Sequence, residues 1–171
     1  MEQLQLRVLS FTELSAASLL ALLTLRQEVF LIEQNSLYRD LDGDDPASLH
    51  LLLRAPDAGN LLVGYGRLLI TKSEAIVGRL VLHADWRRHG LGRQLLEATL
   101  AVAAERGPGL PLRLGAQYPL LEWYRQSGFE PQGKPYDDGG ILHITMVRPS
   151  LTVAPLPVAQ RTASWKISAS A

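Results

Sequence analysis

"WRRHGLGRQLL" (Trp86–Leu96) joins a cationic, glycine-containing turn to the start of an apolar helical pattern. The start of a helix leaves backbone N–H groups without partners, and the helix dipole favours negative charge there. Gly90 and Gly92 lack a Cβ atom and let a ligand approach the main chain. Three arginines add charged donors suited to phosphate oxygens: Arg87, Arg88 and Arg93. We therefore predict an anion-binding loop, with a solvated cationic turn as the alternative.

Two common phosphate-binding motifs do not fit this stretch. A Walker A loop needs Lys and then Ser or Thr after its last glycine, whereas Arg93 and Gln94 follow here. A dinucleotide-binding fingerprint needs a third small residue where Leu95 stands. It also needs an acidic residue about twenty positions further on, where the sequence reads "LPLRLGA".

The segments around the loop alternate between strand and helix patterns. A strand over Ala75–His83 precedes it, and apolar residues at helical spacing predict a helix over Leu91–Arg106. Upstream we predict a strand over Leu4–Phe11, a helix over residues 16–34 capped by Thr12 or Ser15, and a hairpin of strands 49–56 and 61–70. Downstream we predict a strand over 110–116, a helix over 118–127, a strand over 128–133, a turn over 134–140 and a strand over 141–148.

This order, β-α-β-β-β-α-β-α-β-β, predicts an α+β fold. Hairpins give antiparallel pairs and a β-α-β crossover gives a parallel pair, so the sheet is mixed, mostly antiparallel and flanked by helices. After residue 148 the composition shifts to Ala, Ser, Pro and Thr without clear periodicity. We therefore expect one domain over residues 1–148 and a C-terminal tail over 149–171, with Trp165 as a residue that can dock the tail.

Composition narrows the classes of function. The chain has 171 residues and a formal net charge of zero, which argues against a nucleic-acid partner. It has no apolar run long enough to span a membrane and no signal-peptide pattern at its N-terminus, so we expect a cytoplasmic protein. The absence of cysteine excludes disulfides, thiolate metal sites and a Cys nucleophile.

Several segments, in order, resemble the GNAT superfamily of acyl-CoA-dependent N-acyltransferases. "RRHGLG" resembles the family's Arg/Gln-x-x-Gly-x-Gly/Ala loop, and "VGRLVLHADWRRHGLGRQLL" its central strand, turn and helix. "LLEWYRQSGFE" resembles its later aromatic-Tyr-x-x-x-Gly-Phe segment. Within the superfamily, "LRQEVFLIEQN", "DLDGDD" and "LGAQ" are similar to ElaA-type proteins. The resemblance covers roughly residues 3–148.

The resemblance implies acetyl-CoA as cosubstrate, bound where the sheet splays beside the central strand. The matching residues are Leu80, Val81 and Leu82 for the pantetheine arm, and Arg87, Arg88, His89, Gly90, Leu91, Gly92 and Arg93 for the pyrophosphate. Tyr124 matches the tyrosine that protonates the departing CoA thiolate. Packing on a short helix is the alternative for Tyr124.

The acceptor is expected to be an amine, which must lose a proton before it attacks the thioester. Glu33, His50 and His143 are the candidates for the group that removes this proton, and the sequence does not choose among them. Backbone N–H groups near Leu80–Leu82 are candidates for stabilising the oxyanion. Each histidine is also compatible with a structural, hydrogen-bonded place in a strand.

The acidic stretch "DLDGDD" (Asp40–Asp45) resembles a calcium loop only superficially. An EF-hand loop starting at Asp40 needs Gly at its sixth and Glu at its twelfth position, where Asp45 and Leu51 stand. The aspartates are expected to bond local backbone N–H groups in a turn, with an anionic rim that attracts an amine as the alternative. No metal site is predicted, because no ligand spacing such as His-x-x-x-His occurs.

We therefore predict an N-acetyltransferase that moves an acetyl group from acetyl-CoA to a small-molecule or peptide amine. Because no thiol is present to carry the acetyl group, transfer is expected within a ternary complex. Two alternatives are an acyltransferase like the acyl-homoserine-lactone synthases, which share an "R-x-x-V-F" helix and an acidic loop, and a non-catalytic CoA-binding domain. The sequence leaves open whether the protein forms a homo-oligomer.

Overall fold

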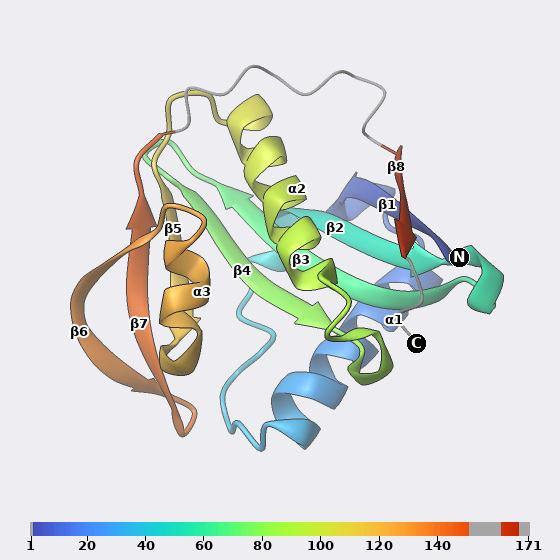
Figure 1. The fold of residues 1–171 in the computed structure, drawn as a ribbon, viewed down its shortest axis with the longest axis horizontal. Helices are drawn as coiled ribbons and strands as arrows, with labels where there is room; N and C mark the ends of the chain where they lie inside the picture. Colours follow the sequence, from blue (N-terminus) through green and yellow to red (C-terminus); the bar gives the residue numbers. More distant parts are fainter. Residues whose placement is uncertain (1, 151–161, 168–171) are drawn as a thin grey trace.

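The computed structural model describes residues 2–150 and 162–167 and contains one mixed sheet (Figure 1). Its eight strands lie in the order β6-β7-β5-β4-β3-β2-β1-β8. The strands are β1 (Glu2–Ser10), β2 (Ser48–Ala55), β3 (Leu61–Ile70), β4 (Ala75–Leu82), β5 (Leu112–Gln117), β6 (Glu130–Asp138), β7 (Ile141–Arg148) and β8 (Thr162–Ile167). Only the β4–β5 pair is parallel among these strands.

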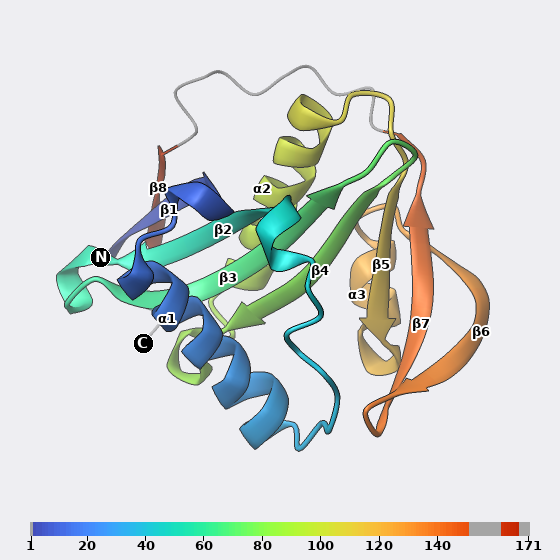
Figure 2. The same cartoon turned by 180° about the vertical axis from the view of Figure 1, so that it is seen from behind.

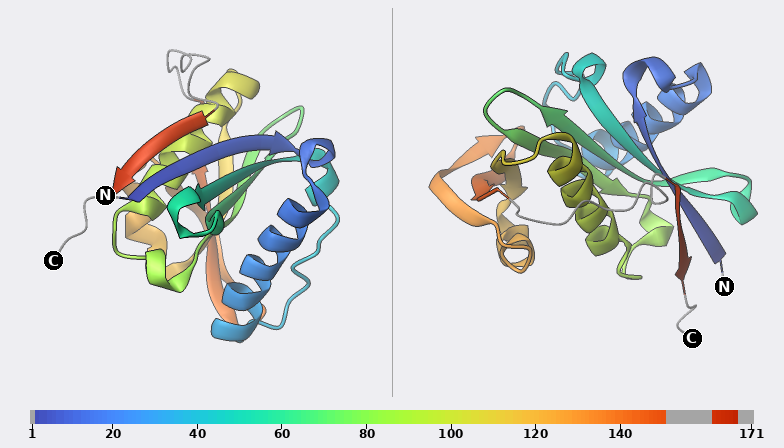
Figure 3. Two further views of the ribbon diagram at one scale, coloured as in Figure 1. Left: turned by 90° about the vertical axis from the view of Figure 1, so that its right-hand side faces the viewer. Right: turned by 90° about the horizontal axis from the view of Figure 1, so that it is seen from above.

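Helices cover both faces of the sheet. Helix α1 (Ala16–Arg26) lies on one face, and α2 (Leu91–Arg106) and α3 (Leu121–Arg125) lie on the other (Figures 2 and 3). Each face has its own core of buried apolar side chains: Leu22 and Leu25 of α1 belong to one, and Leu95 and Leu96 of α2 to the other. The predicted fold class is confirmed, including the order of elements from β1 to β7 and the α2 crossover between β4 and β5.

The predicted long first helix changes its geometry halfway. Ser15 caps it as expected, since its hydroxyl accepts a hydrogen bond from the Ser18 amide at 3.1 Å. The α-helix ends at Arg26, and Gln27–Glu33 form a π-helix (η2), which ends with a bond from the Gln34 amide to the Val29 carbonyl at 3.0 Å. The spacing of apolar residues does not distinguish an α-helix from a π-helical segment that follows it. Such π-helical segments are frequent at functional sites.

The predicted turn over residues 134–140 is wrong for most of its length. Strand β6 continues to Asp138, and the chain reverses at Gly139 and Gly140, both with positive φ. The ladder with β7 slips between Gln132 and Tyr136, which marks a bulge. Pro135 lies inside this bulge of an edge strand, where its missing N–H breaks no ladder bond. Residues that are typical of turns therefore lie in a bulged strand here, which is why the sequence pattern predicted a turn.

The region expected to be a tail contributes β8, which pairs antiparallel with β1 and places Trp165 opposite Leu4. The rest of the expected tail beyond residue 150 lies outside the described residues. Among the helices that the structure describes, none has the length and apolar character needed to cross a membrane.

Candidate active site

Strands β4 and β5 pair at one end only and then diverge (Figure 2). Their ladder consists of Ala75 opposite Leu112 and Ile76 opposite Arg113. From Val77 onward, β4 has no ladder partner on its β5 side, so backbone groups turned to that side are not used in the sheet. The splay implied by the family resemblance is therefore present, and it lies beside Leu80–Leu82 as expected.

A bulge in β4 sets the direction of this open edge. Opposite β3, Tyr65 faces Val81 and Arg67 faces Gly78, so three steps of β4 match two steps of β3. Arg79 lies in the bulge at φ 54°, a left-handed conformation that is uncommon for a residue with a Cβ atom. The bulge therefore falls immediately before the residues predicted to hold the pantetheine arm.

Two glycines of β3 leave room for the side chains of the leucines on this edge. A Cβ atom added at Gly64 would lie 2.8 Å from Leu82 Cδ2, and one added at Gly66 would lie 3.0 Å from Leu80 Cδ2. Both leucines pack against the core on the α2 face. Their side chains are thus fixed on the face that carries the cationic loop.

The cationic loop leaves a run of amides unpaired. The Arg87 amide donates to the Ala84 carbonyl, and the next amides that donate are those of Arg93 and Gln94, both to the Gly90 carbonyl. None of the described turn or loop bonds is donated by the amides of residues 88–92. Arg88 at φ 69° and Gly90 at φ 73° supply the left-handed turns of a backbone nest, which suits an anion.

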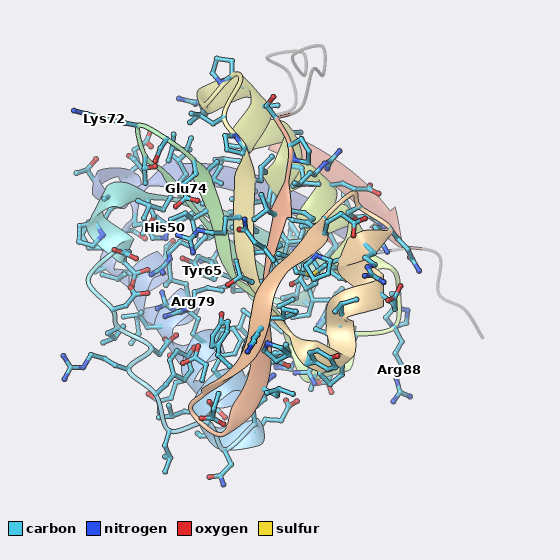
Figure 4. All side chains as sticks on the ribbon, turned by 90° about the vertical axis from the view of Figure 1, so that its left-hand side faces the viewer. His50, Tyr65, Lys72, Glu74, Arg79 and Arg88 are labelled. Carbon is cyan, nitrogen blue, oxygen red and sulfur yellow. The ribbon has the colours of Figure 1, made fainter. Side chains whose placement is uncertain are left out.

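The three arginines of the loop have different partners. Arg88 is exposed and extends away from the fold (Figure 4), and within the described residues neither it nor His89 has a hydrogen bond or ion pair. Arg93 turns to α3, where it donates to the Trp123 carbonyl at 3.2 Å, to Gln126 Oε1 at 2.7 Å and to the Ser127 hydroxyl. Of the arginines predicted to contact phosphate, Arg93 therefore joins α2 to α3, whereas the Arg88 side chain is available to bind a phosphate.

Arg87 is bound to Glu33, the last residue of the π-helix. Its two terminal nitrogens donate to Glu33 Oε1 at 2.6 Å and Oε2 at 2.8 Å, and Nε and Nη2 each lie 3.2 Å from the Leu82 carbonyl oxygen. The hydrogen bonds from Arg87 lower the pKa of Glu33, and the same pairing raises the pKa of Arg87. The structure thus brings two predicted site residues together as an ion pair.

Tyr124 lies on α3 among buried side chains, with its ring edge-on to Trp123 and Phe129. Burial raises the pKa of its phenol to about 12, which keeps the proton in place at neutral pH. The hydroxyl has no hydrogen-bond partner among the described residues.

The sequence matches that of the acetyltransferase (GNAT) domain over residues 15–149. The chain belongs to the GNAT acetyltransferase family. It is 38% identical to protein ElaA of Escherichia coli over 145 residues, which cover 82% of this chain and 93% of ElaA. The crystal structure of E. coli ElaA superposes with a TM-score of 0.79 at 35% identity, covering 85% of this chain and 99% of that one.

Other solved GNAT-like structures extend the comparison. An acyl-CoA N-acyltransferase from Pseudomonas aeruginosa is 33% identical, with a TM-score of 0.79 and coverage of 85% of this chain and 99% of that chain. BjaI, a CoA-dependent acyl-homoserine-lactone synthase, shares the fold at 18% identity and a TM-score of 0.72, covering 87% of this chain and 84% of that one. Membership of the GNAT acetyltransferase family implies that this chain binds a CoA derivative.

Within this GNAT domain, His50 is fully buried on β2. Its Nε2 lies 3.0 Å from the Asp45 carbonyl oxygen and must carry the proton, so Nδ1 accepts from the Tyr65 hydroxyl at 2.8 Å. Burial lowers the pKa of His50, which agrees with this neutral form. Both nitrogens are occupied, so the geometry favours the structural alternative for His50 over the role of base.

His143 is placed differently, on β7 opposite Gln117 of β5 and Tyr136 of β6. Its Nδ1 donates to the Ile141 carbonyl at 2.8 Å, and in the neutral form this bond leaves Nε2 as the acceptor. The Tyr136 ring stacks on the imidazole with centroids 6.0 Å apart. Of the two histidine candidates, His143 is the one whose second nitrogen has no partner in the described part of the chain.

The acidic stretch is held by three arginines that sequence reasoning missed: Arg26 of α1, Arg67 of β3 and Arg79 of β4. Asp42 also accepts the Asp44 amide at 3.1 Å, as the turn prediction requires. Its side chain binds Arg67 at 2.6 Å and Arg79 at 2.9 Å. These ion pairs neutralise much of the proposed anionic rim. In the described residues no group of His, Asp and Glu is arranged to hold a metal ion.

Proposed function

We propose that this protein transfers an acetyl group from acetyl-CoA directly to an amine. The observation that carries the proposal is the divergence of β4 and β5 next to a loop with a run of unpaired amides. An acyl-CoA needs both features, because its pyrophosphate is anionic and its pantetheine arm carries amides that pair like a strand. The loop amides and Arg88 bind the pyrophosphate, and the open edge at Leu80–Leu82 binds the arm.

The reaction follows from this placement. The neutral amine nitrogen attacks the thioester carbonyl, and the oxyanion that forms is stabilised by a backbone N–H group of the β4 edge. The carbon–sulfur bond then breaks, and Tyr124 gives its proton to the CoA sulfur. A phenol whose pKa is about 12 is fully protonated at neutral pH and therefore available as an acid.

His143 is the base that best fits the geometry. Its free Nε2 can take the proton from the attacking amine, directly or through water. Glu33 is held by Arg87 and His50 is enclosed in the core. His143→Gln is expected to lower kcat/KM, because the variant loses the acceptor nitrogen that takes the proton from the amine.

The test is release of free CoA thiol from acetyl-CoA with a panel of small amines and peptides. Thiol release and an acetylated amine in the same mixture support the proposal. Binding of CoA without transfer to any amine would indicate the alternative of a non-catalytic CoA-binding domain. Transfer only when the acceptor is S-adenosylmethionine would indicate the alternative of a lactone synthase.

A further inference from the structure

The end of the π-helix bridges the two strands that diverge. Glu33 binds Arg87, which also holds the carbonyl of Leu82, the last residue of β4. The next residue, Gln34, accepts a hydrogen bond at 2.9 Å from Gln117, the last residue of β5. Two successive side chains therefore link the open ends of β4 and β5 from the α1 side of the sheet.

Most of the N–H donors of Arg87 already have hydrogen-bond partners within the protein. A guanidinium has five N–H donors, and those of Arg87 make four described bonds: two to Glu33 and two to the Leu82 carbonyl. One N–H is left for a phosphate oxygen. The Glu33 carboxylate also offsets the charge that Arg87 would present to an anion.

We propose that Glu33 is a positioning residue for the acyl-CoA loop, acting through Arg87 and the Leu82 carbonyl. This inference rests on the proposed function, because it assumes that the loop holds CoA. The pair holds the end of β4, where the loop begins, in the orientation that exposes the loop amides. Arg87 thus fixes the position of the loop relative to the π-helix, and the loop amides and Arg88 contact the phosphates.

The direction in which the Kd for CoA changes in Glu33→Gln separates this role from its alternatives. Loss of the Glu33 charge leaves the loop more positive, which by itself would tighten binding of an anion. Weaker binding after Glu33→Gln therefore arises from lost positioning. If Glu33 merely competes with phosphate for Arg87, the same variant binds CoA more tightly. If Glu33 is the base, binding stays the same and turnover falls by about 10²–10⁴-fold.

We expect Glu33→Gln to raise the Kd for CoA, measured by titration calorimetry, about three- to five-fold, a size typical of an exposed ion pair. Arg87→Lys should act in the same direction, because a lysine keeps the charge but cannot form the fork to Glu33 and Leu82. The KM for acetyl-CoA should rise together with the Kd in both variants, whereas loss of a base would instead lower the turnover number. The melting temperature should stay close to that of the parent, since exposed pairs add little stability.

Glu74→Gln is the matched control. Glu74 makes a bidentate pair with Arg113, at 2.8 and 2.9 Å and with similar exposure, at the closed end of the β4–β5 ladder (Figure 4). Its loss should leave the Kd for CoA unchanged. A Kd that is unchanged or lowered in Glu33→Gln overturns the inference, as does an equal rise in Glu74→Gln. If the parent binds CoA but acetylates no amine, the proposed function fails and the calorimetry still decides the role of Glu33.

Discussion

The guanidinium of Arg93 on α2 lies over the indole ring of Trp123 on α3, with its central carbon 4.8 Å from the ring centroid. The same side chain donates to the Trp123 carbonyl, so two types of contact join the start of α2 to α3. Tyr124 is the residue after Trp123. The loop proposed to bind phosphate and the phenol proposed as acid are therefore fixed to one another, and substitutions at the start of α2 should affect both.

Gly92→Val should abolish the rise in melting temperature that CoA causes in the parent protein. A Cβ atom at Gly92 would lie 3.7 Å from Trp123 and 3.8 Å from Leu82, and valine adds two further methyl groups there. The larger side chain separates the start of α2 from its neighbours and blocks ligand approach to the backbone. Gly92→Ala, whose Cβ makes ordinary contacts, serves as the control for folding. A full CoA-dependent shift in Gly92→Val would show that the cradle lies elsewhere.

Arg88→Ala should weaken CoA binding and reduce its dependence on salt concentration. Arg88 is exposed and has no ion pair within the described residues, so its charge is available to a phosphate. Alanine has a Cβ atom as arginine does, so both residues adopt the positive φ of position 88 at a similar energetic cost. The measurement is the Kd for CoA at several salt concentrations, with Lys72→Ala, a lysine of the β3–β4 turn, as the control (Figure 4). Equal salt dependence in both variants would contradict this role.

Sequence periodicity predicted the elements that have regular patterns, and the crossover from β4 through α2 to β5 is the best example. Three features escaped it because they depend on contacts between distant residues. Arg67 pairs with Asp42 across 25 positions, and Arg87 pairs with Glu33 across 54. No local spacing signals either pair. The positive φ of Arg79 was also missed, because a bulge is set by the neighbouring strand and arginine carries no turn signal.

The acidic stretch should make the protein sensitive to acid. Burial would raise the pKa of Asp42, but hydrogen bonds from Arg67 and the Asp44 amide hold it well below the ordinary value. A carboxylate with a depressed pKa contributes stability above its unfolded pKa of about 3.9, and this stability is lost as the pH falls further. We expect the free energy of unfolding, measured by urea titration, to decrease below about pH 4. Asp42→Asn should be less stable than the parent at neutral pH and should show a smaller decrease.

Kinetic order should reflect direct transfer, because the chain contains no cysteine to carry an acetyl group. We expect intersecting double-reciprocal lines when acetyl-CoA and the amine are varied together. Mass spectrometry of the enzyme incubated with acetyl-CoA alone should find no acetylated active-site residue. Parallel lines together with a covalent acetyl-enzyme would contradict direct transfer.

Tyr124→Phe should reduce kcat by about 10²–10⁴-fold, the usual contribution of general acid catalysis. The substitution keeps the ring, which packs edge-on against Trp123 and Phe129, and removes a hydroxyl that bonds to no described residue. The melting temperature and the Kd for CoA should therefore stay close to those of the parent. Single-turnover measurement is required, because slow product release would hide part of the loss.

The choice of leaving group provides an independent control for Tyr124. An acetyl thioester whose thiol is more acidic than that of CoA leaves as a thiolate with less need of a proton donor. Tyr124→Phe should recover much of its lost rate with such a thioester, whereas a variant damaged in packing should not. Transfer by Tyr124→Phe at the parent rate with acetyl-CoA would identify Tyr124 as a packing residue, and the acid would then have to be water or another side chain.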